Sequence, residues 1–385
     1  MKKYLFVFIL AASTFLMAEQ NDLQQQVRKG IDLLYSNQVA TAHCADSNSC
    51  PDQVNKNELV QRALEFKQNY DEIISNYKIK NLVWKKPEKH YEQMSQFQFD
   101  SPIQKEGSPA NTVYGYLYKP TIPDDCNVHL PATLLVHHVA NDVSDEQLFA
   151  SLASKMNKGI IMIIYLPEYG PRKKNKNDAP FSKDMTEFKN SLLQSLVDIR
   201  IAGEILKTIE SVDTKKMQIG GLSLGALLTT IFAGLDPFFD SYLIGLGGGD
   251  LSNAMTMDKN KAQGVIKDAL ANIDWNKDEA RKTLSDFDAL TWAYTVKNKE
   301  FVFLSADDDE LVDKEKSVRK LILAYAQNGN KIKHYEHKGS HVPDVKTLGY
   351  NEAGKSYLKV IYRVFSFLGD NMSAEIEQCR NKYNN

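Results

Sequence analysis

A pentapeptide of the pattern G-x-S-x-G occupies residues 221–225, with Ser223 at its centre. A strand-like run with apolar Met217 and Ile219 precedes it, and an apolar, helix-like run follows over residues 226–232. A serine on a very tight strand-to-helix turn projects its hydroxyl into open space. Such a turn has room only for small residues two positions before and after the serine, and both are glycine here. The sequence therefore predicts a nucleophile at Ser223, with the N-terminus of the next helix favouring developing negative charge.

This strand–turn–helix resembles the nucleophile elbow of the α/β-hydrolase superfamily, and the resemblance extends roughly from Asn111 to Leu368. Within that superfamily the chain looks like the serine esterase branch, similar to acetyl esterases and dienelactone hydrolases. The resemblance implies an α/β-hydrolase fold, in which helices flank a mostly parallel central sheet. Continuous apolar runs such as residues 131–136 and 159–166 are typical of strands buried on both faces of such a sheet.

The superfamily places a triad acid after a strand downstream of the serine. Residues 300–305 are such a strand, and the acidic run Asp307-Asp308-Asp309 follows. The acid typically begins an Asp-x-x-Val sequence, and Asp309 has Val312 in that register. We therefore predict Asp309 as the acid, with Asp307 and Asp308 as rivals.

The superfamily histidine follows the last strand, which we place at residues 331–337. His341 comes next in a Gly-Ser-His sequence, whereas His334 and His337 lie within the strand and are weaker candidates. The resemblance thus implies that His341 is the general base for Ser223 and that Asp309 orients its imidazole.

An oxyanion hole is expected from two backbone N–H groups, those of Leu224 and Val139. Family members commonly have His-Gly after the strand at residues 131–136, but this chain has His137-His138-Val139. A side chain at His138 therefore stands where glycine usually lets the backbone approach, and we expect it to contact the substrate. His137 and His138 could instead be metal ligands, although a histidine that shapes the strand end is the simpler interpretation.

A second loop at the carboxyl edge of the predicted sheet, residues 167–172, offers further substrate contacts. Ligands bind at this edge in open α/β sheets. Tyr169 and Arg172 are the candidates, and the alternative is an exposed loop with an incidental aromatic residue and cation. We expect no metal and no cofactor.

The N-terminus has the pattern of a secretory signal peptide over residues 1–18. Lys2 and Lys3 precede an apolar run that is short for a transmembrane helix, and Ala18 suits cleavage before Glu19. We therefore expect a periplasmic or secreted protein with no membrane span after cleavage; an uncleaved anchor is the alternative.

The mature chain is expected to have two parts. Residues 19–95 have helical apolar periodicity and read as a helical N-terminal extension, which could contribute to a lid. Residues 96–385 form the predicted hydrolase domain. The resemblance implies that an insertion at about residues 251–296 is a small cap over the site.

The chain has four cysteines, and an even number in an exported protein favours disulfides. Cys44 and Cys50 close a short loop rich in turn residues, so we predict a disulfide between them. Cys126 and Cys379 remain as a second possible pair.

The composition limits the classes of binding partner that we expect. The net charge is −2, which does not suggest a nucleic-acid partner. We expect a small-molecule, carbohydrate or peptide ester as substrate, for example that of an acetyl esterase acting on carbohydrate or of a short-acyl carboxylesterase. Two alternatives are a serine peptidase like prolyl oligopeptidase, for whose propeller this chain is too short, and a non-catalytic binding protein that keeps the fold.

Overall fold

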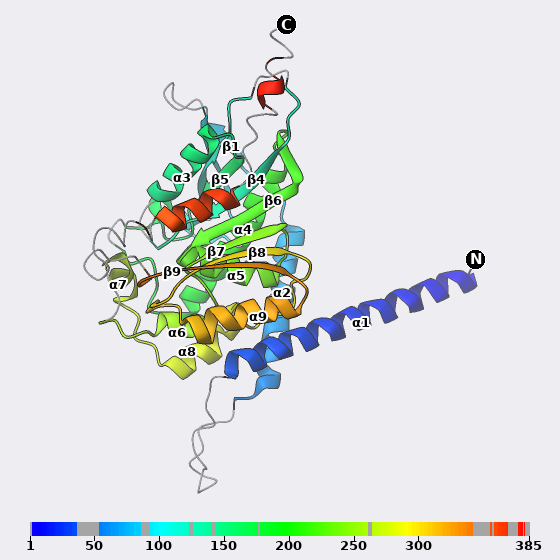
Figure 1. Ribbon diagram of the computed structural model, residues 1–385. Coiled ribbons are helices and arrows are strands. Elements are labelled where there is room, and N and C mark those ends of the chain that lie inside the picture. Colours follow the sequence, from blue (N-terminus) through cyan, green and yellow to red (C-terminus); the bar gives the residue numbers. More distant parts are fainter. Residues whose placement is uncertain are drawn as a thin grey trace.

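The computed structural model describes residues 2–36, 54–85, 93–122, 126–139, 143–175, 178–260, 264–341, 355, 358–368, 376–379 and 381. Within these residues one nine-stranded sheet has the order β1-β2-β3-β5-β4-β6-β7-β8-β9 and runs through the body (Figure 1). The strands are β1 (Val83–Lys85), β2 (Met94–Asp100), β3 (Thr112–Tyr118), β4 (Leu130–Val136), β5 (Ile160–Ile164), β6 (Val212–Leu222), β7 (Ser241–Gly245), β8 (Glu300–Ala306) and β9 (Lys331–His337).

The pairing of neighbouring strands changes once along the sheet, from antiparallel to parallel. The pairs from β1 to β5 are antiparallel, and the pairs from β5 to β9 are parallel. All residues of β4 and β5 are buried, as expected for central strands covered on both faces. The carboxyl ends of the parallel strands meet at one edge, which is where ligands bind in such sheets.

Helices cover both faces of the sheet. They are α1 (Lys2–Tyr35), α2 (Lys56–Asn76), α3 (Ser144–Lys155), α4 (Met185–Lys207), α5 (Leu224–Leu235), α6 (Leu251–Met255), α7 (Gly264–Leu270), α8 (Lys277–Leu284) and α9 (Arg319–Gln327). Short 3-10 turns span Pro109–Asn111, Gly170–Arg172 and Ser285–Phe287, and a π turn spans Lys314–Val318. A further helix covers residues 358–367.

Two apolar cores follow from the period-2 alternation of the strands. Leu135 and Ile163 pack on one face with α3 and the helix at residues 358–367. Leu134 and Met162 point to the other face, into the larger core that includes α4 and α5. The sheet is therefore the middle of three layers. This is the α/β-hydrolase arrangement expected from the sequence.

The N-terminal helices pack into the body. Apolar residues of the second half of α1 and of α2, such as Ile31 and Leu59, belong to the larger core. At Gly30 a side chain would meet the backbone oxygen of Thr291 at 2.0 Å, so only glycine permits this close approach. The first half of α1 projects from the body (Figure 1). The segment predicted to be helical over residues 19–95 also contains a strand, β1, which the helical pattern did not indicate.

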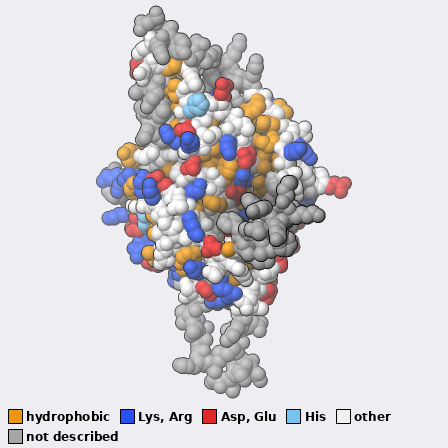
Figure 2. Space-filling model, turned by 90° about the vertical axis from the view of Figure 1, so that its right-hand side faces the viewer, with side chains coloured by type: hydrophobic (Ala, Val, Ile, Leu, Met, Phe, Trp, Pro, Cys, Tyr) orange, Lys and Arg blue, Asp and Glu red, His pale blue; other side chains and the backbone are white. Residues whose placement is uncertain are grey.

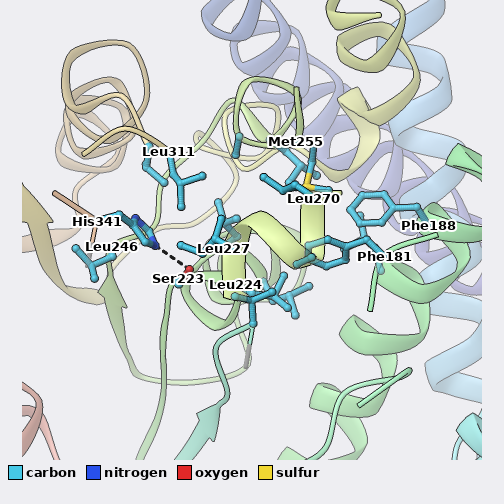
Figure 3. Close-up of a pocket in the computed structure, with 18 of the residues that line it drawn as sticks. Phe181, Phe188, Ser223, Leu224, Leu227, Leu246, Met255, Leu270, Leu311 and His341 are labelled. Carbon is cyan, nitrogen blue, oxygen red and sulfur yellow. Dashed lines mark hydrogen bonds between the residues drawn. The ribbon is translucent and has the colours of Figure 1, made fainter. Parts of the chain in front are cut away.

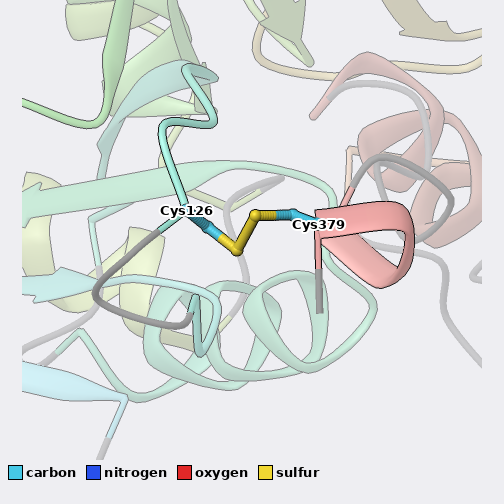
Figure 4. Close-up of a disulfide and its surroundings, with 2 residues drawn as sticks. All are labelled: Cys126 and Cys379. Carbon is cyan, nitrogen blue, oxygen red and sulfur yellow. A yellow bond between two sulfur atoms is a disulfide. The ribbon is translucent and has the colours of Figure 1, made fainter. Parts of the chain in front are cut away.

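A disulfide joins Cys126 to Cys379, residues 253 positions apart (Figure 4). It ties the loop before β4 to the C-terminal segment. The predicted Cys44–Cys50 pair lies outside the described residues. Among the helices that the structure describes, none has both the length and the apolar character to cross a bilayer. Figure 2 shows basic and acidic side chains interspersed over one face of the molecule.

Candidate active site

Ser223 lies between β6 and α5 in a strained backbone conformation, with φ 52° and ψ −115°. A positive φ at a residue other than glycine is costly and persists only where the surroundings impose it. A side chain at Gly221 would approach the carbonyl carbon of Gly225 to 2.3 Å, and one at Gly225 would approach the oxygen of Val136 to 2.1 Å. The two glycines therefore make this turn possible, as the pentapeptide predicts.

His341 lies between the serine and an acid. Its Nε2 is 2.8 Å from Ser223 Oγ, and its Nδ1 is 2.9 Å from Asp309 Oδ2. The His341 side chain is only 2% exposed. Because Asp309 accepts a hydrogen bond from Nδ1–H, the proton of the neutral ring is on Nδ1 and Nε2 is free to accept the proton of the serine hydroxyl. The structure thus brings Ser223, His341 and Asp309 together in one hydrogen-bonded chain, in which His341 can take the serine proton and Asp309 orients the imidazole.

The four acids after β8 have different partners. Asp309 Oδ1 also accepts hydrogen bonds from the N–H groups of Leu311 and Val312, at 2.9 and 2.8 Å, which hold the carboxylate in place. Asp307 Oδ1 instead accepts from Gly339 N at 2.6 Å, and Asp308 is exposed. Of the three aspartates only Asp309 hydrogen-bonds His341.

Glu310 is a site residue that the sequence analysis missed. Its Oε2 accepts the backbone N–H of His341 at 3.0 Å. Asp307 and Glu310 therefore fix the backbone at His341 itself and two residues before it. The pairing joins two loops about thirty residues apart, so local sequence contains no signal for it.

The remaining histidine candidates lie elsewhere. His334 Nε2 is 2.7 Å from Ser305 Oγ within the sheet, and His337 is the buried last residue of β9. Burial lowers the pKa of both imidazoles. The described contacts of these residues do not include Ser223.

The two proposed oxyanion donors both border the cavity beside Ser223. Leu224 is the first residue of α5, where backbone N–H groups have no partner within the helix. Val139 lies just beyond β4. The N–H of the preceding residue, His138, is occupied, because it donates to Glu146 Oε1 at 3.1 Å.

His138 turns toward α3 and is not among the residues that line the cavity. Its Nδ1 is 2.8 Å from Glu146 Oε1. Burial raises the pKa of Glu146, but the hydrogen bond from His138 and the charges of His138 and His137 together outweigh it, so the net pKa is lowered. The side chain that replaces glycine here anchors the loop to α3, and the substrate contact predicted for His138 stays a prediction.

His137 is fully buried and joins two loops. Its Nε2 accepts from Leu166 N at 3.0 Å, and its Nδ1 lies 2.7 Å from the oxygen of His138, to which it donates. Burial lowers the pKa of His137 to about 4, so the ring is neutral at pH 7. This is the loop-shaping role favoured by the sequence. In the described part of the chain, no group of three or more His, Cys, Asp or Glu could hold a metal ion.

The predicted substrate contacts at Tyr169 and Arg172 are wrong. Arg172 is 0% exposed and forms an ion pair with Asp198 of α4, Nη2 to Oδ2 2.7 Å. It also donates to the backbone oxygens of Tyr165 and Ala110. Tyr169 is buried with its ring edge-on to His137, at 4.6 Å between centroids. Both residues hold the loop after β5 against the body.

An apolar cavity opens beside Ser223 (Figure 3). Its walls come from α4, α5, α6 and α7, from the segment before α4, and from the loops after β4, β7, β8 and β9. None of the described lining residues belongs to the segment at 19–95. Apart from Ser223 and His341, all described lining residues are apolar: Val139, Phe181, Phe188, Leu192, Leu224, Leu227, Leu228, Ile231, Leu246, Leu251, Ala254, Met255, Ile266, Ala269, Leu270, Leu311 and Val312. The cavity therefore suits an uncharged, apolar group.

Known structures share this architecture. An acetyl xylan esterase from Paenibacillus sp. is 18% identical with a TM-score of 0.50, and the match covers 82% of this chain and 97% of that chain. Acetyl xylan esterase 1 from Thermoanaerobacterium sp. is 12% identical with a TM-score of 0.53, covering 77% and 94%. The acylaminoacyl peptidase of Pyrococcus horikoshii is 17% identical with a TM-score of 0.51, covering 77% of this chain but 43% of the peptidase.

Comparison with family models gives no match, and no curated protein matches the sequence. The structural similarities, together with the mostly parallel sheet and the elbow, show that this chain has the fold of the α/β-hydrolase superfamily.

Proposed function

We propose that the protein is a serine hydrolase that cleaves carboxylic esters through an acyl-serine intermediate. The observation that carries the proposal is the continuous chain from Ser223 Oγ to His341 Nε2 and from His341 Nδ1 to Asp309. A serine hydroxyl is a poor nucleophile at neutral pH and needs such a base. The strained backbone of the elbow, which places the Ser223 hydroxyl beside His341, also supports it.

The reaction has two steps. Ser223 Oγ attacks the ester carbonyl while His341 Nε2 takes its proton, and the N–H groups of Leu224 and Val139 donate to the carbonyl oxygen as it becomes negative. His341 then gives the proton to the alcohol oxygen, which leaves. Water attacks the acyl-serine with His341 again as base, which releases the carboxylic acid and restores Ser223.

The lining of the cavity favours an ester over a peptide. Within the described lining no carboxylate is present to bind a terminal ammonium group, and the walls offer few hydrogen bonds to a peptide backbone. Moving unpaired peptide groups into such an environment is costly. An ester carries no N–H group and enters at lower cost.

Two assays test the proposal. A fluorophosphonate probe should label the wild type but not Ser223→Ala, and p-nitrophenyl esters should be hydrolysed in preference to aminoacyl p-nitroanilides. Ser223→Ala and His341→Ala should each abolish most turnover, with the double variant scarcely worse, because residues that act as one unit are strongly non-additive. No labelling of folded wild type would favour a binding protein; preference for the anilides would favour a peptidase.

We also propose that the protein is exported to the periplasm or beyond, with cleavage near Glu19. The Cys126–Cys379 disulfide supports this, because structural disulfides persist mainly in oxidising compartments. N-terminal sequencing of protein from its native cell tests the proposal, and a retained Met1 on cytosolic protein would reject it.

A further inference from the structure

The cavity extends from Ser223 in one main direction. Figure 3 shows His341 and Leu246 on one side of the serine, with Met255, Leu270 and then Phe181 and Phe188 on the other. We call the part between Ser223 and Phe188 the apolar arm. Residues of α5, α6 and α7 line it.

The end of the arm is an aromatic wall. The ring of Phe188 lies 5.6 Å from that of Phe181 and 5.2 Å from that of Trp275, centroid to centroid. Trp275 is held by a hydrogen bond from its Nε1 to the backbone oxygen of Lys183, at 2.7 Å. The wall thus consists of three aromatic rings, with Phe188 in contact with the other two. It limits the length of a substrate chain that the arm can hold.

Proton transfer decides which half of an ester lies in the arm. The alcohol oxygen must lie near His341 Nε2 to receive its proton, so the alcohol is on the histidine side of Ser223. The carbonyl carbon bonds to Ser223 Oγ, and the acyl chain then continues away from His341. That direction is toward Met255, Leu270 and Phe188.

An acetyl group would leave most of the arm unfilled. The single methyl of an acetyl group would reach only the residues next to Ser223, whereas the described apolar lining continues to Phe181 and Phe188. Each further methylene that enters an apolar site is worth about a fourfold gain in kcat/KM if its burial is retained in the transition state. Because the arm is apolar along its described length, the gain should continue until the chain reaches the aromatic wall.

We propose that the apolar arm binds the acyl chain of the substrate and that the preferred esters carry medium-length, unbranched apolar acyl groups rather than acetyl. This rests on the proposed ester hydrolysis at Ser223. It separates this chain from an enzyme that removes acetyl groups from carbohydrate. The alcohol half is left near the mouth, where its chemistry is less constrained.

A panel of p-nitrophenyl acetate, butanoate, hexanoate and octanoate tests the proposal in the wild type. We expect kcat/KM to rise along the series, on the order of a hundredfold from acetate to the best ester. The octanoate-to-acetate ratio should fall by about tenfold or more in Leu270→Trp, where a larger ring occupies the arm, and should not fall in Leu270→Ala. Leu323→Trp, an exposed position of α9 outside the cavity, is the matched control and should keep the wild-type ratio.

A second measurement separates this inference from the proposed function. Methyl octanoate should raise the Tm of Ser223→Ala, which cannot turn it over, and methyl acetate at the same concentration should not. Hydrolysis and fluorophosphonate labelling at Ser223 with acetate as the best substrate would overturn the acyl-chain assignment and leave the serine hydrolase intact. Absence of hydrolysis and labelling would overturn the proposed function, and absence of the Tm shift would then overturn the arm as well.

Discussion

Two loops leave the same edge of the sheet, one after β5 and one after β8, and their charged residues face opposite ways. The loop after β8 presents Asp309 to His341, 2.9 Å from its Nδ1. The loop after β5 turns Arg172 inward to Asp198, where both side chains are 0% exposed. A position at the carboxyl edge of the sheet is therefore not enough to make a residue part of the active site. Whether it belongs to the site depends on which residue its side chain contacts.

The difference has a physical origin. Arg172 has five donors, and buried donors require partners. Asp198 on α4 and the carbonyls of Tyr165 and Ala110 accept hydrogen bonds from the two Nη groups, whereas the buried Nε has no partner among the described residues. These bonds fix the loop after β5 to the interior of the protein. Asp309 Oδ1 instead accepts hydrogen bonds from two N–H groups of its own loop, and Oδ2 accepts one from the imidazole of His341. The charged residue of the loop after β5 holds that loop in place, whereas the charged residue of the loop after β8 orients the imidazole of His341.

The largest expected effect is on the loop after β8. Asp309→Asn should lower kcat by about ten-thousandfold, because an amide cannot hold the imidazole in the required tautomer. Asp308→Asn should be close to wild type, since that residue is exposed. Steady-state kinetics on one ester tests all three aspartates, and a deeper loss in Asp307→Asn than in Asp309→Asn would reassign the acid.

The next largest effect is expected on the free energy of unfolding, when the buried Arg172 is replaced. Arg172→Met leaves Asp198 buried without its cation, which should lower the free energy of unfolding by about 3–5 kcal/mol. Turnover per fluorophosphonate-labelled site should change little, because Arg172 does not border the cavity. Chemical denaturation measures the first quantity and active-site titration the second.

A matched control for Arg172→Met is Lys105→Met, which removes an exposed ammonium 4.0 Å from Glu187. Exposed pairs contribute little, so this variant should unfold like the wild type. A large loss of kcat per labelled site in Arg172→Met would return this residue to the binding site.

The pH dependence of stability depends on His137, which ties β4 to the loop after β5. Its pKa in the folded protein is lowered to about 4 by burial, against 6.5 when free. Between these values the unfolded chain binds more protons than the folded one, so this stability is present above the ordinary pKa and is lost as pH falls toward 4. The contribution is about 3 kcal/mol.

His137→Gln should remove this part of the pH dependence, although it also weakens the hydrogen bond to Leu166. Denaturation between pH 7 and pH 4.5 measures the slope for the variant and the wild type. His129→Gln, at an exposed position, should retain the wild-type slope. An unchanged slope in His137→Gln would mean that the ring is not held neutral.

The smallest effect is expected at Glu310. Glu310→Ala removes the acceptor for the His341 N–H and should lower kcat/KM by about tenfold, as expected from the loss of one hydrogen bond. Glu310→Gln retains an acceptor oxygen and should recover most of the activity. If both variants match the wild type, the histidine loop is positioned by Asp307 without help from Glu310.

Much of the fold could be predicted because its signals are local. The apolar runs of β4 and β5 indicated strands buried on both faces, and Gly221 and Gly225 marked the elbow. Register in the Asp-x-x-Val sequence separated Asp309 from its neighbours. Each of these features is a property of a few consecutive residues.

What could not be predicted depends on partners distant in the chain. Arg172 forms an ion pair with Asp198, and His138 hydrogen-bonds Glu146. Strand β1 forms only because Val83 and its neighbours pair with β2. The apolar arm combines residues of α4, α5, α6 and α7 that each read as ordinary core residues. Helical periodicity shows that a face is apolar, but not whether a neighbour fills the space beside it.

The central claim is that Ser223 carries the acyl group during turnover. The most direct measurement is mass spectrometry of protein quenched in acid during hydrolysis of p-nitrophenyl butanoate, followed by peptide mapping. The account predicts a butanoyl adduct on the peptide that contains Ser223, accumulating in the wild type and missing from Ser223→Ala. Ester turnover by folded Ser223→Ala at the wild-type rate, or an adduct on another residue in active wild type, would contradict it.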